Sequence, residues 1–162
     1  MRRVAALVAV VVVMLGLAAA PAHAAEPVRS PMQERIDQVL AEFPGGVQIA
    51  PNAVSWERGT IVLELSGAVA ARAFAGCATG AYCAWSGIGY TGSKLTFTAC
   101  SATGSQVNLS PLGAPGSANS FANARSSGRV AVVNSGSTVR WVAAGTGVAS
   151  FTPLSTHLRC FT

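Results

Sequence analysis

The sequence predicts a mainly β protein, a small antiparallel sandwich or barrel preceded by one short helix and a few antiparallel strands. From Cys77 onward, short alternating stretches rich in Val, Thr and aromatic residues recur, and Gly, Ser and Asn turn signals separate them every several residues. No segment there shows convincing helical periodicity, and this spacing is typical of a small antiparallel sandwich or barrel. The 162 residues suffice for one such domain after a targeting segment is removed.

Residues 1–24 are predicted to be a secretory signal peptide. Arg2 and Arg3 precede an uncharged apolar run at residues 4–17, and Ala22-His23-Ala24 follows as a cleavage site. The run is shorter than the roughly 20 residues that a membrane-spanning helix needs. We therefore expect a secreted protein that has no membrane contact after cleavage.

An amino-terminal extension at residues 25–76 is expected to begin with a helix at residues 31–43. Ser30 can cap this helix, Pro31 suits its first position and Gln33 can complete a capping box. The apolar residues that follow at helical spacing are Met32, Ile36, Val39, Leu40 and Phe43. Pro44-Gly45-Gly46 then ends the pattern. We expect this apolar stripe to pack on the protein's own sheet.

Strands are expected on both sides of a linker. In the extension they cover residues 47–49, 54–56 and 60–65, and residues 66–76 are interpreted as the linker. In the domain at residues 77–162 they cover residues 82–85, 94–98, 129–133, 138–143 and 148–151, with residues 102–119 as one long irregular connection.

The charged residues exclude several functions for the carboxyl-terminal domain. All six acidic side chains lie at or before Glu64, so that domain cannot supply paired carboxylates for acid–base catalysis or hard oxygen ligands for calcium or magnesium. Its basic residues are Lys94, Arg125, Arg129, Arg140 and Arg159. They are isolated and not interleaved with aromatic residues, so nucleic acid is not an expected partner. Their positive charge favours anionic cell-wall polymers or acidic proteases as partners. The alternative is that these residues contribute to solubility alone.

Four cysteines in an exported chain predict two disulfides. Three connectivities are possible, and we favour Cys77 with Cys83 and Cys100 with Cys160, one local clip and one long tie. Zinc is the alternative, but the chain has no Cys-x2-Cys pair and only one His, His157, after the signal peptide.

No catalytic residue, metal ligand or cofactor site is predicted. His157 is the only mature His and Asp37 the only Asp, so a Ser-His-Asp arrangement would have to join the first helix to the end of the chain. We interpret His157 as a surface or half-buried residue beside Arg159 and Cys160.

The most specific motif begins at Trp85. Trp85 is followed after four residues by Tyr90, then by Gly92, and Ser120 comes later in the unit. This spacing resembles the βγ-crystallin Greek-key motif, in which a hairpin folds over, two aromatic rings pack and the Gly adopts a conformation that other residues resist. The resemblance implies a βγ-crystallin-like Greek-key β-sandwich. Pro115 and Gly116 stand where many βγ-crystallin units carry calcium-binding Asn or Asp, so we expect no calcium site.

The wider arrangement resembles the Streptomyces metalloproteinase inhibitor family. The resemblance covers roughly residues 77–141 and rests on Cys77-x5-Cys83, on the Gly-rich motif from Trp85 to Gly92, and on Ser120-Phe121-Ala122-Asn123. It implies a secreted, non-catalytic and monomeric protein whose partner is an extracellular protease, most specifically a metalloprotease.

The family's inhibitory segment reads Cys-Val-Arg-aromatic and is closed by its own disulfide. The matching residues here are Thr138, Val139, Arg140 and Trp141, with Thr138 in place of the half-cystine. An alternative interpretation makes Val139 and Trp141 core-facing residues of an ordinary strand with Arg140 pointing outward. Because the closing disulfide is missing, we expect Val139 to lie in the core, and residues 102–119 are then the next candidate for an inhibitory loop.

The alternative function is a cell-envelope, polysaccharide-binding or antimicrobial module of the same fold. An inhibitor needs one protruding, constrained loop with an apolar residue. A glycan binder needs exposed aromatic rings beside hydrogen-bonding side chains. Which of Trp56, Trp85 and Trp141 is exposed therefore helps to separate the two functions.

Overall fold

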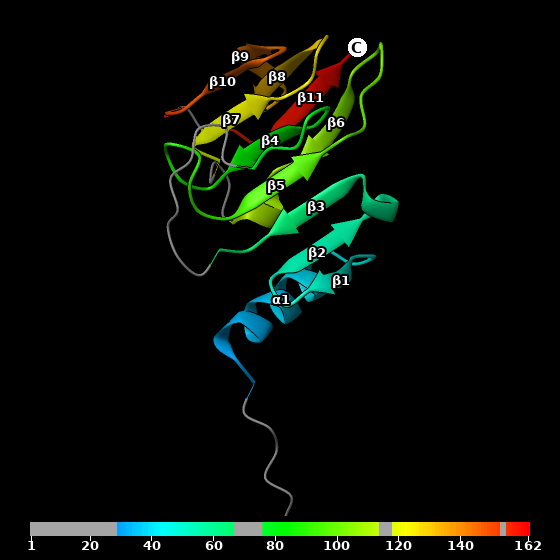
Figure 1. Cartoon of the computed structure of the whole chain (residues 1–162), viewed down its shortest axis with the longest axis vertical. Coiled ribbons are helices and arrows are strands. Elements are labelled where there is room, and N and C mark those ends of the chain that lie inside the picture. The colour runs from blue at the N-terminus through cyan, green and yellow to red at the C-terminus, as the bar shows by residue number, and fades with distance from the viewer. Residues whose placement is uncertain (1–28, 67–75, 114–117, 153–154) are drawn as a thin grey trace, which may run out of the picture.

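Eleven strands in two antiparallel sheets and one α-helix make up the described chain (Figure 1). The computed structural model describes residues 29–66, 76–113, 118–152 and 155–162. Within these ranges the prediction of a mainly β fold is confirmed. The predicted signal peptide and nearly all of the predicted linker lie outside the described residues, as do Pro115 and Gly116.

Helix α1 (Pro31–Glu42) begins as predicted and ends one residue early. The Gln33 backbone N–H donates to the Ser30 hydroxyl at 3.2 Å, which is the predicted cap. The second half of the predicted capping box is wrong, because the Gln33 side-chain oxygen accepts from the Gln48 side-chain amide at 3.1 Å and not from the Ser30 backbone N–H. Phe43 is the C-cap at φ −119° and ψ 81°, so it is not helical.

The larger sheet, sheet A, runs β1-β2-β3-β5-β4-β7-β10. Its strands are β1 (Val47–Ala50), β2 (Ala53–Trp56), β3 (Ile61–Glu64), β4 (Tyr82–Trp85), β5 (Lys94–Phe97), β7 (Ser120–Asn123) and β10 (Thr146–Val148). A 3₁₀ helix, η1 (Glu57–Gly59), turns the chain from β2 into β3. Strand β3 pairs with β5, so the strands of the extension continue the sheet of the domain that follows. A salt bridge of 2.9 Å between Glu64 and Lys94 lies on the same pair.

The smaller sheet, sheet B, runs β6-β11-β8-β9. Its strands are β6 (Ser105–Asn108), β8 (Arg129–Asn134), β9 (Ser137–Ala143) and β11 (His157–Phe161). Among β4–β7 the third strand lies in sheet B, and among β8–β11 the third strand lies in sheet A. The two halves of the domain thus exchange their third strands. The Greek-key detail stays a prediction.

Three strands were not anticipated from the alternation of the sequence. Residues 102–119 are not wholly irregular as predicted, because they contain β6 and the 3₁₀ helix η2 (Ser110–Leu112). Strands β7 and β11 also lay outside the expected ranges. Strand β10 ends at Val148, where the predicted strand began.

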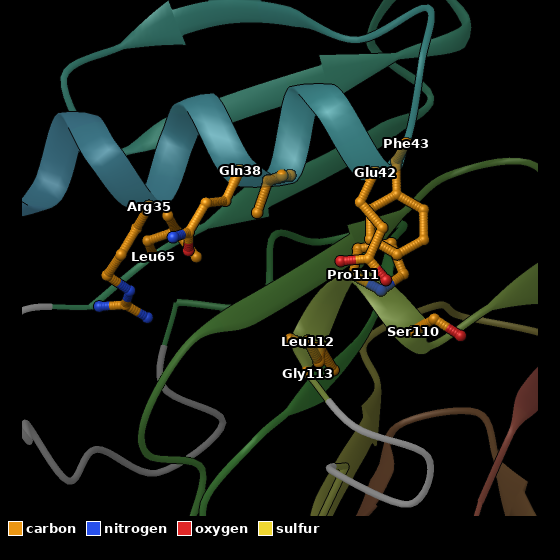
Figure 2. A pocket seen from close by; sticks show the side chains of 10 residues that line it. Arg35, Gln38, Glu42, Phe43, Leu65, Ser110, Pro111, Leu112 and Gly113 are labelled. Atoms are coloured by element: carbon orange, nitrogen blue, oxygen red, sulfur yellow. The ribbon is translucent and has the colours of Figure 1, made fainter.

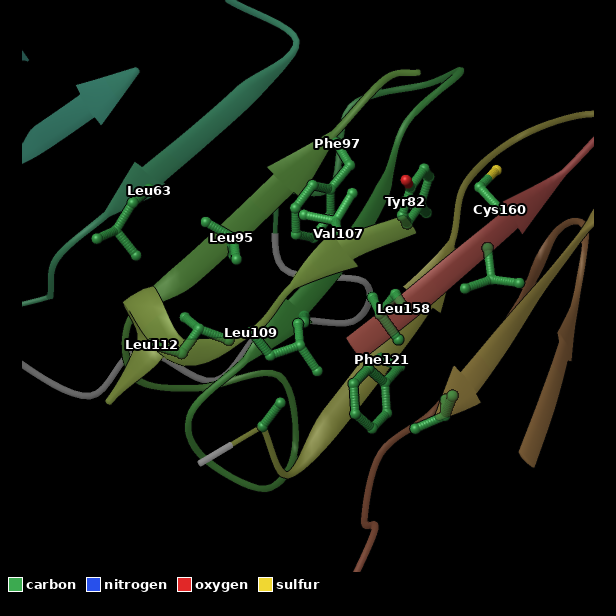
Figure 3. Packing of buried hydrophobic residues seen from close by; sticks show 14 of the residues in the cluster. Leu63, Tyr82, Leu95, Phe97, Val107, Leu109, Leu112, Phe121, Leu158 and Cys160 are labelled. Atoms are coloured by element: carbon green, nitrogen blue, oxygen red, sulfur yellow. The ribbon is translucent and has the colours of Figure 1, made fainter. Parts of the chain in front are cut away.

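One continuous core lies between the two layers (Figure 3). Sheet B covers one end of the inner face of sheet A, and α1 covers the other end, where Ile36 is fully buried beside the Val54–Leu63 pair. This confirms that the helix packs on the protein's own sheet. Large side chains of the core include Tyr82, Phe97, Phe121, Phe151, Leu63, Leu95 and Leu158.

Tyr82 is a buried polar group within this core. Its hydroxyl donates to the Ala99 carbonyl at 3.1 Å, and its ring stacks on Phe97 with centroids 5.1 Å apart. Burial raises the pKa of the Tyr82 hydroxyl well above its ordinary value of 10.0, while the charge of Arg125 opposes that shift. The folded state therefore holds the Tyr82 proton more tightly than the unfolded state does.

Tyr82→Phe should remove part of the loss of stability at alkaline pH. Because the pKa is raised in the folded state, the stabilisation is complete below the unfolded pKa near about 10 and is lost as pH rises through the folded value. At neutral pH the variant should lose about 1 kcal/mol with its hydrogen bond. Denaturant unfolding measured across this alkaline range tests the prediction. Burial also raises the pKa of Tyr90, by less than that of Tyr82, so Tyr90→Phe should reduce the alkaline loss of stability less than Tyr82→Phe does. An identical alkaline slope in wild type and Tyr82→Phe would contradict the prediction.

Candidate functional site

The motif residues predicted from sequence meet at the hairpin between β4 and β5. The Tyr90 ring lies edge-on to the buried Trp85 ring, with centroids 5.2 Å apart. Ser120 on β7 accepts a hydrogen bond from the Tyr90 backbone N–H at 3.0 Å, and its hydroxyl donates to the Gly87 carbonyl at 2.7 Å. The structure therefore brings Trp85, Tyr90 and Ser120 together and fixes the hairpin to the sheet.

Gly92 occupies a position of this hairpin that combines positive φ with close packing. Its φ is +82°, and a Cβ there would meet the Ser86 hydroxyl and the Gly87 backbone nitrogen. The Gly87 N–H donates to the Thr91 carbonyl at 2.9 Å, which closes the turn. The tip carries Ile88, which is 64% exposed. The hairpin is thus a rigid loop with one protruding apolar side chain.

Two disulfides join the pairs favoured from the sequence. Cys77 bonds Cys83, and Cys100 bonds Cys160. The first lies in a small apolar cluster with Trp85 and Tyr90, and the second links the segment after β5 to β11. The loop-closure model assigns a stabilisation of about 4 kcal/mol to the Cys100–Cys160 disulfide and of about 2 kcal/mol to the Cys77–Cys83 disulfide.

The predicted inhibitory segment lies on β9, one of the two edge strands of sheet B. Thr138, Val139, Arg140 and Trp141 are all exposed, and the exposed fractions of Val139 and Trp141 are 40% and 45%. The expectation that Val139 lies in the core is therefore wrong. An edge strand has sheet on one side only, so residues that would be covered in a central strand face solvent.

A bulge sets Val139 apart from its neighbours. Val133 of β8 pairs with Thr138 and Val132 pairs with Arg140, so Val139 is the extra residue between the two pairs. A two-residue turn, Ser135-Gly136, precedes β9, and both of its residues have positive φ, at 47° and 85°. Such turns match the twist of the strands that they join. The segment is thus extended, exposed and anchored to β8 on both sides of Val139.

A row of stacked side chains lies on the outer face of sheet B, the face away from sheet A. The Arg129 guanidinium lies 4.2 Å from the centre of the Trp141 ring, and the Trp141 and Phe161 ring centroids are 5.6 Å apart. Arg159 lies over Phe161 at 5.7 Å. The stacking of Arg129, Arg159 and Phe161 was not predicted from the sequence. The alternation of outward-facing residues on β11 is the sequence signal that could have indicated Arg159 and Phe161.

A groove lies where α1 meets η2 (Figure 2). It holds about 380 Å³ and is lined by polar side chains of the helix and by apolar residues of both elements. The lining includes Arg35, Gln38, Glu42, Phe43, Leu65, Pro111 and Leu112.

The residues considered for catalysis lie on different elements. Asp37 on α1 accepts hydrogen bonds from Arg29 and Gln33. His157 on β11 is half-buried, and its Nδ1 lies 3.0 Å from the Thr156 hydroxyl. Within the described ranges, no three His, Cys, Asp or Glu residues gather in a way that would hold a metal ion.

The geometry defines a disulfide-bonded β-sandwich that presents a rigid hairpin and an exposed edge strand. Residues 70–141 match the family model described as peptidase inhibitor family I36, and this match confirms the predicted resemblance to the Streptomyces metalloproteinase inhibitor family. The matched range contains the Trp85 hairpin and ends at Trp141. It supports a protease inhibitor with a protease as its partner.

No curated protein and no solved structure matched the chain. In the part of the chain that the structure describes, no helix is long and apolar enough to span a membrane.

Proposed function

We propose that the protein is a secreted, non-catalytic and monomeric inhibitor of extracellular metalloproteases, and that β9 is the segment that enters the protease cleft. The observation that carries the proposal is the exposed, extended stretch from Thr138 to Trp141 at a free sheet edge. It lies inside the range that matches the peptidase inhibitor family. Two disulfides fit an extracellular location.

A free sheet edge binds a partner through its backbone. The outer edge of β9 has no neighbouring strand in sheet B, so its N–H and C=O groups on that side are available to pair with a strand of the protease. Val139 then offers an apolar side chain to a specificity pocket, while the backbone hydrogen bonds set the register. This is the binding mode of an extended substrate.

An inhibitor must also survive in the cleft. Thr138 and Arg140 pair with β8 on either side of Val139, so a cut beside Val139 would leave both new ends held by the sheet. The Ser135-Gly136 turn and the stacked Trp141 restrain the two ends of the segment further. Such restraint lowers the entropy lost on binding, which is the role of the loop disulfide in the family that the chain resembles.

A polysaccharide-binding module is the second candidate, and one observation favours it. Trp141 is 45% exposed beside the Arg129 guanidinium, whereas Trp85 is buried. An exposed aromatic ring beside hydrogen-bond donors is what a glycan binder requires. The family match gives the inhibitor the stronger support.

Inhibition assays of residues 25–162 against a thermolysin-like metalloprotease and, in parallel, against trypsin-like and subtilisin-like serine proteases test the proposal. We expect competitive inhibition of the metalloprotease at stoichiometric or near-stoichiometric concentrations and little effect on the serine proteases. Inhibition restricted to the serine proteases would overturn the target class. A folded protein that inhibits none of them would overturn the inhibitor assignment.

A further inference from the structure

The stacked row on sheet B is a cationic surface next to the proposed binding edge. Arg129, Trp141, Phe161 and Arg159 follow one another across the outer face of the sheet, and Trp141 also ends the segment on β9. A chain lying along β9 would therefore lie beside this row. Arg140, on the same segment, is exposed and makes no side-chain contact with another described residue that would neutralise it.

Charge is separated along the length of the molecule. The described acidic side chains are Glu34, Asp37, Glu42, Glu57 and Glu64, on α1, η1 and β3. Figure 1 shows α1 and β1–β3 at one end and sheet B at the other. The two salt bridges between described residues, Arg29–Asp37 and Glu64–Lys94, both lie outside sheet B.

Among the described residues, the arginines of sheet B thus have no acidic side chain to pair with. A guanidinium stacked on an aromatic ring is weakly hydrated and keeps its planar edge free for bidentate hydrogen bonds to a carboxylate. Arg129 is in this state, and the Nε atom of Arg159 is buried with no hydrogen-bond partner among the described residues. The surface is complementary to an acidic partner.

We propose that the target protease carries a carboxylate-rich rim beside its cleft, and that the sheet B row of Arg129, Trp141, Phe161 and Arg159 docks on that rim. This inference rests on the proposed function and names the chemistry of its partner. The charge separation directs the β9 end of the inhibitor toward the cleft, and such steering raises the association rate far more than it lowers the dissociation rate.

The experiment measures association and dissociation rates with an acidic thermolysin-like protease as a function of salt. Raising the salt concentration from about 0.02 M to about 0.5 M makes the Debye length shorter than the distance over which the charges attract the protease. The wild-type association rate should therefore drop about tenfold. Arg129→Gln/Arg159→Gln should lose most of that advantage at low salt and show a flatter salt dependence, with its dissociation rate changed less than threefold.

Arg58→Gln/Arg35→Gln is the matched control, because it removes the same charge at the far end of the molecule. Both of these arginines lie in the extension, on η1 and α1. The control should keep the wild-type association rate and salt slope. Thermal melts verify that both double variants are folded, and Arg129→Lys/Arg159→Lys should restore the salt slope because it restores the charge.

Three outcomes overturn the proposal in distinguishable ways. Inhibition with a salt-independent association rate, or an equal loss in the control variant, overturns the acidic rim and leaves the proposed function standing. A folded protein that inhibits no protease at any salt overturns both. Binding of polygalacturonate that depends on Arg129 and Arg159 and does not compete with the protease assigns the row to an anionic glycan instead.

Discussion

Val139→Asp should abolish inhibition of the target protease while the free energy of unfolding changes by less than about 0.5 kcal/mol. Val139 is 40% exposed and lies in a bulge on an edge strand, so a carboxylate there stays hydrated in the free protein. In the complex the same carboxylate would enter an apolar pocket without a partner. Burying an unpaired charge costs several kcal/mol, which corresponds to a loss of affinity of a thousandfold or more.

The control for this variant is Val47→Asp. Val47 lies on β1, an edge strand of sheet A, and is 64% exposed. It should change neither the inhibition constant nor the melting temperature. A folded Val139→Asp protein that inhibits as well as wild type would rule out the β9 assignment. Ile88→Asp, at the tip of the rigid hairpin, is then the next variant to measure.

Gly92→Val should destabilise the protein by about 2 kcal/mol or more, because a β-branched residue is strained at positive φ. The position is also crowded, since the new Cβ would press on the Ser86 hydroxyl and the Gly87 nitrogen. Displacing either group disturbs the turn that carries Ile88. Thermal melts and denaturant unfolding measure the effect.

Gly45→Val separates the two causes of this destabilisation. Gly45 has φ +86°, close to the +82° of Gly92, but a Cβ there meets no heavy atom within 4 Å. It should show the backbone strain alone. The difference between the two variants reports the close approach inside the hairpin, and equal melting temperatures would mean that the crowding at Gly92 is relieved without cost.

Several strands with regular alternation or strong β-formers were predictable from the sequence, although β11, which also alternates, was not expected. Strand β5 alternates between half-buried and buried residues and was expected within one residue of its observed bounds. Strand β7 is buried on both faces and so shows no alternation. Strand β6 reads Ser-Gln-Val-Asn with a single apolar residue, because only Val107 faces the core. Pairing with distant strands stabilises both, and local patterns do not record it.

The residues of the candidate site could be predicted from the sequence, but their exposure to solvent could not. The spacing of Trp85, Tyr90 and Ser120 anticipated a hairpin that the structure ties down with two hydrogen bonds. Val139 was expected in the core because the missing loop disulfide removes the main reason for this segment to stand out from the sheet. Position in the sheet decided otherwise, since β9 is an edge and the bulge breaks the alternation. The edge position of β9 depends on the order of strands in the whole sheet, which the residues around Val139 do not record.

The exchange of third strands has a mechanical consequence. Each half of residues 77–162 contributes one strand to the sheet of the other half. Strand β6 therefore has no partner until β11, the last strand of the chain, has formed, and β10 pairs only with β7. The two halves therefore cannot separate without breaking strand pairs in both sheets. A protease that pulls on β9 pulls, through β8 and β11, on a strand of the opposite half. Fraying of β9 is therefore opposed by strands from both halves, which suits the proposed role of β9 in a protease cleft.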